Sequence, residues 1–412
     1  SPRIANRQAR PETSRPAEIG LKEQRLSQRR YSRRLSAISP FRVMELLARA
    51  QALDAAGVDV VHMEVGEPDF PTPAPILDAA RRAIDGGATR YTAASGLPEL
   101  REALSALYAD RYGCDVAPER ILVTAGASGA LLLATAMVVE SGDNLLMTDP
   151  GYPCNRHFLQ TLGAEGRLIP VGPEDDYQLN ESLVREYWDE RTRGVLLASP
   201  ANPTGALIRE RVLEGIITEV DARSGFLLMD EIYHQLTFGE LAPRSVVSQT
   251  DDAFVIGSFS KYFGMTGFRL GWLVVPDGAE SEALKLAQNL FICASTLAQH
   301  AALAAFEPAA HAIMEAQRAT LRKRRDYLVP ALRDAGFAVP RMPEGAFYVY
   351  AGLPAGHSAE AFCNNALDTH HVSVTPGTDF GFHRADGHIR ITYAESRDRL
   401  EQGVARLAEA LR

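Results

Sequence analysis

Short apolar runs alternate with longer stretches of helical periodicity through most of the chain. A turn rich in Gly, Pro, Asn, Asp or Ser follows almost every run. The runs occupy residues 121–123, 144–148, 195–199, 226–229, 254–257 and 273–275. Strands without a polar face that alternate with helices are typical of a mostly parallel sheet covered on both faces. The pattern therefore predicts an α/β fold whose large domain has a mostly parallel, seven-stranded-type sheet.

The two ends of the folded region have a different pattern. Apolar residues first recur at helical spacing near residue 40, where Pro40 suits the first turn of a helix that Gly57 ends. After about residue 296 the pattern becomes long helices with short strands around 346–350 and 388–393. We therefore expect a large domain over 66–300 and a smaller α+β domain made of 35–65 and 301–412.

Charge is spread unevenly along the 412 residues. Residues 1–34 contain ten Lys and Arg against three Glu, whereas the whole chain has a net charge of −9. With few large apolar residues, this basic segment is expected to be disordered or loosely attached. An expression remnant, a mis-assigned start and an organelle-targeting segment are its possible origins, although it lacks a convincing apolar face. The strongly acidic remainder argues against nucleic acid as the main partner.

The composition also excludes several classes. No apolar run reaches the roughly 18–20 residues that span a bilayer, and no secretory signal is visible. The four cysteines, 114, 154, 293 and 363, form no C-x-x-C pair and accompany no H-E-x-x-H helix. This argues against structural metal and a disulfide framework. We expect a cytoplasmic protein with no metal and no membrane partner.

Polar or small residues follow the apolar runs at the edge where open α/β sheets bind ligands. After 121–124 comes A-G-A-S-G, where Ala127 and Ser128 could hold a phosphate at a helix start near residue 130; a tight turn without ligand is the alternative. After 145–148 comes D-P-G-Y-P, where Tyr152 could stack on a planar ring; the alternative is a surface aromatic.

Two further runs end in groups suited to a pyridine ring. Asn202, in P-A-N-P-T-G, could donate to a phenolate oxygen, or could form an ordinary Asn-Pro turn. Asp230, in D-E-I-Y, could hold a protonated pyridine nitrogen, with Tyr233 reaching the ring oxygen. The alternative is that Asp230 caps a following helix.

The last of these runs leads into S-F-S-K-Y-F-G-M-T-G-F-R at residues 258–269. Lys261 could form a Schiff base with an aldehyde cofactor, while Ser258 and Arg269 hold its phosphate. The alternative is an exposed Lys and Arg on a loop. Burial beside an electron-poor ring would lower the pKa of Lys261, so that it could act as nucleophile and then as base. Together the five strand ends describe a pyridoxal 5′-phosphate site.

The chain resembles the class I and II aminotransferases of the aspartate aminotransferase fold, which is fold type I of the pyridoxal-phosphate enzymes. The resemblance covers about residues 36–412 and follows the family's order of motifs. The motifs are G-E-P-D-F at 66–70, Y-T at 91–92, T-A-G-A-S-G at 124–129, D-P-G-Y-P at 149–153, N-P-T-G at 202–205, D-E-I-Y at 230–233, S-F-S-K at 258–261 and H-I-R-I-T at 388–392.

The resemblance implies the roles given above and adds three residues. Arg390 resembles the arginine that clamps the substrate α-carboxylate, with a solvated ion pair as the alternative. Gly66 resembles the glycine that lets backbone approach that carboxylate. Tyr91 resembles the tyrosine that reaches the phosphate of the neighbouring subunit, which implies a homodimer with shared sites. The implied reaction moves an amino group from an L-amino acid to a 2-oxo acid.

Other functions remain as alternatives. A β-eliminating carbon–sulfur lyase on the same scaffold would use the same lysine and ring contacts. A non-catalytic regulator would need a DNA-binding domain, for which residues 1–34 are too short, and a dehydrogenase would need G-x-G-x-x-G after a strand. No second Arg or Lys is identifiable as a receptor for a side-chain carboxylate, which argues against a strict aspartate or glutamate donor. The sequence does not name the donor or the acceptor.

Overall fold

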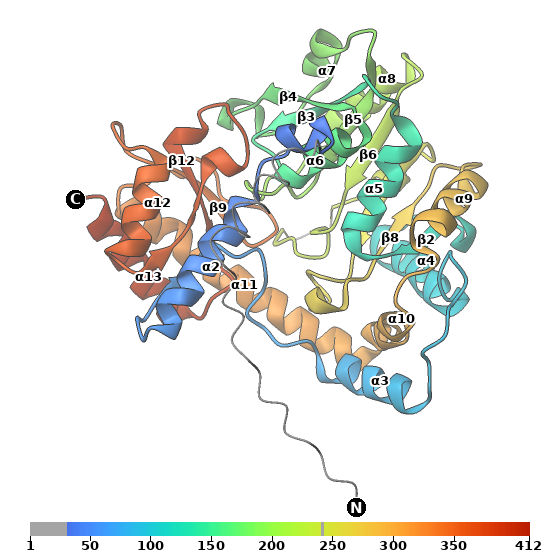
Figure 1. The fold of residues 1–412 in the computed structure, drawn as a ribbon, viewed down its shortest axis with the longest axis horizontal. Helices are drawn as coiled ribbons and strands as arrows, with labels where there is room; N and C mark the ends of the chain where they lie inside the picture. Colours follow the sequence, from blue (N-terminus) through green and yellow to red (C-terminus); the bar gives the residue numbers. More distant parts are fainter. Residues whose placement is uncertain (1–30, 240–242) are drawn as a thin grey trace, which may run out of the picture. The chain divides into compact units, whose positions relative to one another are not determined.

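The computed structural model describes residues 31–239 and 243–412, and the chain divides into two compact units, Ser1–Ser39 and Pro40–Arg412 (Figure 1). In the first unit the described residues form one short 3-10 helix, Arg33–Ala37, where the Ser32 hydroxyl accepts the Arg34 amide at 3.4 Å. The prediction of a disordered basic segment falls almost wholly on residues 1–30, which lie outside the described residues.

The second unit is built on a seven-stranded sheet with the order β2-β8-β7-β6-β5-β3-β4, which confirms the predicted α/β fold. All neighbours are parallel except β8, which runs antiparallel to both β2 and β7. The strands are β2 (Ile121–Thr124), β3 (Asn144–Asp149), β4 (Glu165–Pro170), β5 (Thr192–Ala198), β6 (Phe226–Asp230), β7 (Ala253–Ser258) and β8 (Gly271–Val274). Each predicted run overlaps one strand, and β4 has no predicted counterpart.

Helices cover both faces of this sheet, so successive side chains of one strand enter different cores. In β7, Phe254 and Ile256 pack with the first set of helices, whereas Val255 points to the second. The first set is α5 (Gly126–Val138), α6 (Pro153–Leu162) and α9 (Glu280–Phe291). The second set includes α3 (Ala74–Asp85), α4 (Pro98–Tyr112), α7 (Glu181–Tyr187), α8 (Glu210–Asp221), α10 (Thr296–Leu303) and α11 (Pro308–Asp334).

Two smaller sheets complete the unit, and one of them pairs residues from both of its ends. Strand β12 (His388–Thr392) lies between β9 (Tyr348–Gly352) and β11 (Thr375–Pro376), antiparallel to both, and β1 (Val61–His62) pairs in parallel with β10 (Val372–Ser373). Helices α2 (Arg42–Ala55), α12 (Ala359–Asp368) and α13 (Arg397–Ala410) pack around them. Helix α2 is the predicted helix, but Pro40 precedes it rather than occupying its first turn. The division into 66–300 and 35–65 with 301–412 stays a prediction.

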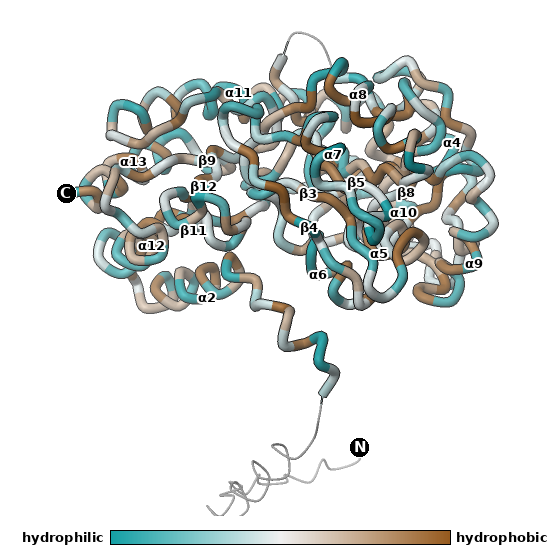
Figure 2. The backbone as a smooth tube through the Cα atoms, turned by 90° about the horizontal axis from the view of Figure 1, so that it is seen from above, coloured by the Kyte–Doolittle hydropathy of each residue, from teal (hydrophilic) through white to brown (hydrophobic). Residues whose placement is uncertain are grey.

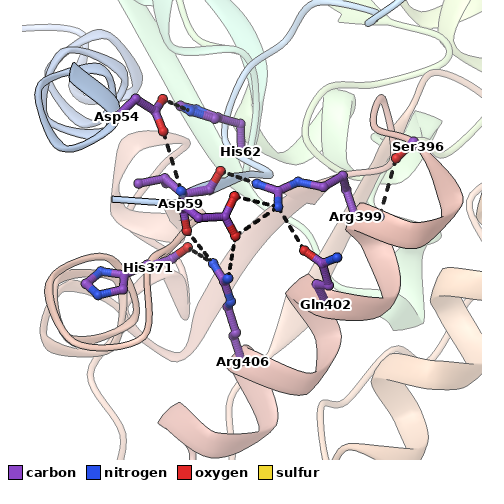
Figure 3. A network of polar contacts seen from close by, with 9 residues as sticks. Asp54, Asp59, His62, His371, Ser396, Arg399, Gln402 and Arg406 are labelled. Carbon is purple, nitrogen blue, oxygen red and sulfur yellow. Dashed lines mark hydrogen bonds and ion pairs between the residues drawn. The ribbon is translucent and has the colours of Figure 1, made fainter. Parts of the chain in front are cut away.

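A polar network ties β1 to α2 and α13 (Figure 3). His62 contacts Asp54 of α2 through Nε2 at 2.7 Å and Glu64 through Nδ1 at 2.8 Å. On the α13 side, Asp59 accepts from Arg399 at 2.8 Å and from Arg406 at 2.7 Å. Figure 2 shows α2 and α11 alternating between hydrophobic and hydrophilic residues, as helices with one buried face do. Within the described residues, no helix is long and apolar enough to cross a membrane.

Candidate active site

A cavity of about 280 Å³ lies where strands of the large sheet end. Asp230 is the last residue of β6 and Ser258 the last of β7, and both line it. The cavity brings together all the predicted site residues except Tyr91. This is the edge of an open α/β sheet at which ligands bind, so the cavity is the candidate active site.

Lys261 points into this cavity from the segment after β7. Its Nζ donates to the carbonyl oxygen of Gly66 at 2.6 Å and lies 5.9 Å from the ring centroids of Tyr233 and Phe347. Burial lowers the pKa of Lys261 to about 8, and the positive charge of Arg390 acts in the same direction. A substantial fraction of the amine is therefore neutral near physiological pH, as a nucleophile requires.

Asp230 supplies a carboxylate that is only 4 % exposed. Burial raises its pKa to about 7, while the amide of Ile232, which donates to Oδ1 at 3.2 Å, opposes that rise. Residues 231–239 form turns rather than a helix, so the helix-cap alternative is wrong. The described residues give Asp230 no ion pair within 4.0 Å. A cationic ring nitrogen is a suitable partner for such a carboxylate.

The start of α5 and the guanidinium of Arg269 meet at one end of the cavity. The helix begins at Gly126, so Ala127 and Ser128 lie in its first turn, four residues earlier than expected. Gly126 has φ +70°, and a Cβ there would lie 2.8 Å from Nη2 of Arg269. Free amides at a helix start and a nearby cation make an anion site.

Arg269 is held only by neutral acceptors among the described residues. Its Nη1 donates to the carbonyl oxygen of Thr266 at 3.1 Å and to Oγ of Ser260 at 3.4 Å. Oγ of Ser258 in turn accepts the amide of Ser260 at 3.0 Å. The guanidinium charge therefore remains available to a phosphate.

Three side chains surround the middle of the cavity. Oδ1 of Asn202 accepts from Arg390 at 3.1 Å, which leaves its amide nitrogen to donate. The hydroxyl of Tyr233 lies 2.9 Å from that of Tyr348. The ring of Tyr152 meets Phe41 edge to face, with the centroids 6.2 Å apart. An amide donor, a phenol and an aromatic face suit a planar hydroxypyridine.

Arg390 is 2 % exposed and stands in the middle of β12, which excludes the solvated ion pair considered above. Its Cζ lies 4.4 Å from the ring centroid of Tyr348 and 4.7 Å from that of Phe380, and its Nη2 donates to the Glu64 carbonyl at 2.5 Å. Its Nε is buried without a hydrogen-bond partner, and no carboxylate of the described residues pairs with it. A buried guanidinium of this kind suits a ligand carboxylate.

Gly66 and Tyr91 occupy very different places. A Cβ on Gly66 would lie 2.6 Å from the hydroxyl of Tyr348, so a larger residue would displace that ring. Tyr91 is 78 % exposed and does not line the cavity.

The sequence interpretation missed several lining residues. Glu67 lies within the G-E-P-D-F motif, Thr266 follows Lys261 in the same segment, and Tyr348 stands in β9. Phe41 directly precedes α2, and the residues after it belong to that helix. The apolar spacing predicted α2, but nothing in that spacing showed that the helix lines the site.

Comparisons with known proteins agree with this geometry. A family described as aminotransferase class I and II matches residues 58–407. The chain is 37 % identical over 378 residues to a valine–pyruvate aminotransferase of Mycobacterium tuberculosis, covering 91 % of this chain and 97 % of that one. It is 32 % identical to an aspartate aminotransferase of Thermotoga maritima, covering 92 % and 99 %. A crystal structure of an aminotransferase from M. tuberculosis superposes with a TM-score of 0.90 at 36 % identity, covering 93 % and 99 %.

Proposed function

The chain belongs to the class I and II aminotransferases, and on that premise we propose that it transaminates with pyridoxal 5′-phosphate bound covalently to Lys261. Moving an amino group from an L-amino acid to a 2-oxo acid is the activity that the family and the named relatives support. The covalent bond to Lys261 and the roles of the other site residues are our proposal.

One observation carries this proposal. None of four ionisable side chains of the cavity has a counter-charge within ion-pair distance among the described residues; they are those of Lys261, Asp230, Arg269 and Arg390. Asp230 and Arg390 are buried, and burying charges without partners is costly unless a ligand supplies the partners; Lys261 is half-buried and Arg269 is exposed. A phosphate for Arg269, a ring nitrogen for Asp230, an aldehyde for Lys261 and a carboxylate for Arg390 match the four groups.

Each residue then has a defined task. When bound, the cofactor supplies an electron sink for removal of the substrate α-proton. Lys261 Nζ takes that proton and returns it, since it is partly neutral at physiological pH. Arg390 holds the α-carboxylate, and Asp230 keeps the ring nitrogen charged. The Asn202 amide donates to the ring oxygen, and Tyr152 covers the ring face.

The carbon–sulfur lyase alternative is not favoured, because the relatives are named aminotransferases.

The proposed homodimer, location and amino donor each have narrower support. Exposure of Tyr91 outside its own cavity supports a homodimer with shared sites. Four unpaired cysteines support a cytoplasmic location. Relatives are named for valine and for aspartate, and valine is the candidate donor here, because no receptor for a side-chain carboxylate is identifiable.

The test is the Lys261→Ala variant, with Lys285→Ala of α9, whose lysine is exposed, as the matched control. After borohydride treatment with the cofactor, mass spectrometry should show a covalent adduct on the wild type and on Lys285→Ala only. Transamination by Lys261→Ala should fall by at least about 10²–10⁴-fold, the contribution of one positioned acid–base group. An adduct on Lys261→Ala with unchanged turnover would remove the assignment.

A further inference from the structure

We propose that the amino-acid substrate of this enzyme carries an apolar side chain, and that the first two turns of α2 bind it. This inference rests on the proposed function and adds the substrate class to it. Four apolar side chains, one just before α2 and three in its first two turns, line the same cavity as Lys261 and Arg390; they are Phe41, Val43, Met44 and Leu47. No part of the transamination chemistry assigned above uses them.

The start of α2 stands close to the place where a substrate carboxylate would bind. The amide of Arg42 donates to Oδ1 of Asp379 at 3.3 Å, and the next residue, Phe380, covers the guanidinium of Arg390 at 4.7 Å. Phe41 also contacts Tyr152, the ring proposed to cover the cofactor. An amino acid held by its carboxylate on Arg390 therefore has its side chain within reach of α2.

The charged groups that one copy of the chain contributes to the cavity leave no receptor for an acidic side chain. The lining residues include three cations, Lys261, Arg269 and Arg390, and each already has a task in the proposed function. The lining carboxylates are those of Glu67 and Asp230. A side-chain carboxylate would lose its hydration without gaining a cation from the described lining, which is unfavourable.

Helix α2, which carries most of these apolar side chains, is held by polar contacts near both of its ends. Arg42 pairs with Glu360 of α12 at 2.9 Å near one end of α2, while Asp54 contacts His62 at 2.7 Å near the other (Figure 3). These partly exposed pairs add little stability, but they define where the helix lies beside the cavity. Met44 is the most exposed of the four apolar side chains, at 55 %. Its flexible side chain can shift to fit substrate side chains of different length.

The first experiment measures specificity on the cofactor-loaded enzyme. We expect kcat/KM for leucine or methionine to exceed that for alanine, aspartate and glutamate by at least about tenfold, as expected for even one methylene in an apolar pocket. Calorimetry with 4-methylpentanoate and glutarate gives a readout without turnover, because neither has an amino group to react. The branched monocarboxylate should bind more tightly.

A positive charge placed among these apolar side chains should reverse the preference for an apolar ligand. Met44→Lys should weaken 4-methylpentanoate and strengthen glutarate, whereas the control Met342→Lys, at an exposed methionine outside this cavity, should change neither. Aspartate or glutamate as the best donor of the wild type, or an unchanged preference in Met44→Lys, would overturn the inference while leaving transamination intact. Failure of every amino acid as a donor would instead overturn the proposed function.

Discussion

Burial tunes the charged residues of the site in opposite directions. It lowers the pKa of Lys261 to about 8 and raises that of Asp230 to about 7, because desolvation disfavours the charged form of either group. Both groups can therefore change protonation near physiological pH. Two groups with shifted pKa values that share one cavity indicate a functional site. A charged ring nitrogen entering the cavity would favour the ionised form of Asp230 and the neutral form of Lys261.

The surroundings of His62 raise its pKa, whereas those of Lys261 lower its pKa. The hydrogen bond to Glu64 raises the pKa of His62 to about 9, with Asp54 helping and burial opposing. Because the folded protein holds this proton more tightly than the unfolded chain, with its pKa of 6.5, the stabilisation is fully present below pH 6.5. It is lost as the pH rises through 9.

The pH dependence can be measured with His62→Gln, which keeps a polar group without the charge. At pH 6 we expect the variant to unfold about 2 kcal/mol more easily than the wild type, the usual contribution of a charge-assisted hydrogen bond. By pH 10 the difference should shrink strongly. Urea unfolding at the two pH values, with exposed His311→Gln as control, checks this. An equal loss at both values would show that the His62 charge contributes nothing.

Among the helices and strands, the sequence predicted those whose pattern is complete within one segment. Strands such as β7 are buried on both faces, so each reads as an apolar run, and their ends carry the groups that the cavity collects. Strand β4 was missed because it is an edge strand with the half-polar sequence E-G-R-L-I-P. The two-residue strands β1 and β10 exist only through pairing between distant segments, and β11 only through pairing with β12, so none of them leaves a local pattern.

The position of some site residues was likewise predictable from the sequence, and that of others was not. Lys261 and Asp230 follow apolar runs directly, so their position at the sheet edge follows from the pattern. The burial of Arg390 does not, because Tyr348, Phe380 and Glu64, which enclose it, come from three separate segments. Helix α2 shows an ordinary amphipathic pattern, and only tertiary packing places its first turns in the cavity.

The β2–α5 connection offers a test of the anion site as an element. Gly126→Ala and Gly113→Ala place Ala at φ +70° and +64°, and either should cost about 1–2 kcal/mol of stability. Only at position 126 does the new Cβ approach Arg269, at 2.8 Å; nothing lies within 4 Å at position 113. We expect Gly126→Ala alone to weaken pyridoxal 5′-phosphate binding, by at least about tenfold for 1.4 kcal/mol lost. Equal dissociation constants in calorimetry would exclude this phosphate site.

The segment around Tyr91 bears on how two copies of the whole molecule could contact each other. The carbonyl of Arg90 accepts from Oγ1 of Thr296 at 2.6 Å, and Thr92 Oγ1 accepts from the buried Gln299 at 3.0 Å. Tyr91 therefore projects from an anchored segment, although its own ring is exposed. An exposed aromatic residue of this kind is available for contact with a second copy of the chain. In a two-fold dimer, each copy would place its Tyr91 at the other's cavity.

Mixing two inactive variants tests this arrangement. If Tyr91 completes the partner's phosphate site, a dimer of one Tyr91→Ala chain and one Lys261→Ala chain has one cavity with both residues intact, while the other carries both defects. Once subunits have exchanged, such mixed dimers should regain up to about half of one wild-type dimer's activity, since two-fold symmetry gives two equivalent sites. Tyr91→Ala must first prove strongly impaired alone, and native mass spectrometry must confirm exchange. With both conditions met, a mixture that stays inactive would place Tyr91 and Lys261 in the same subunit's site.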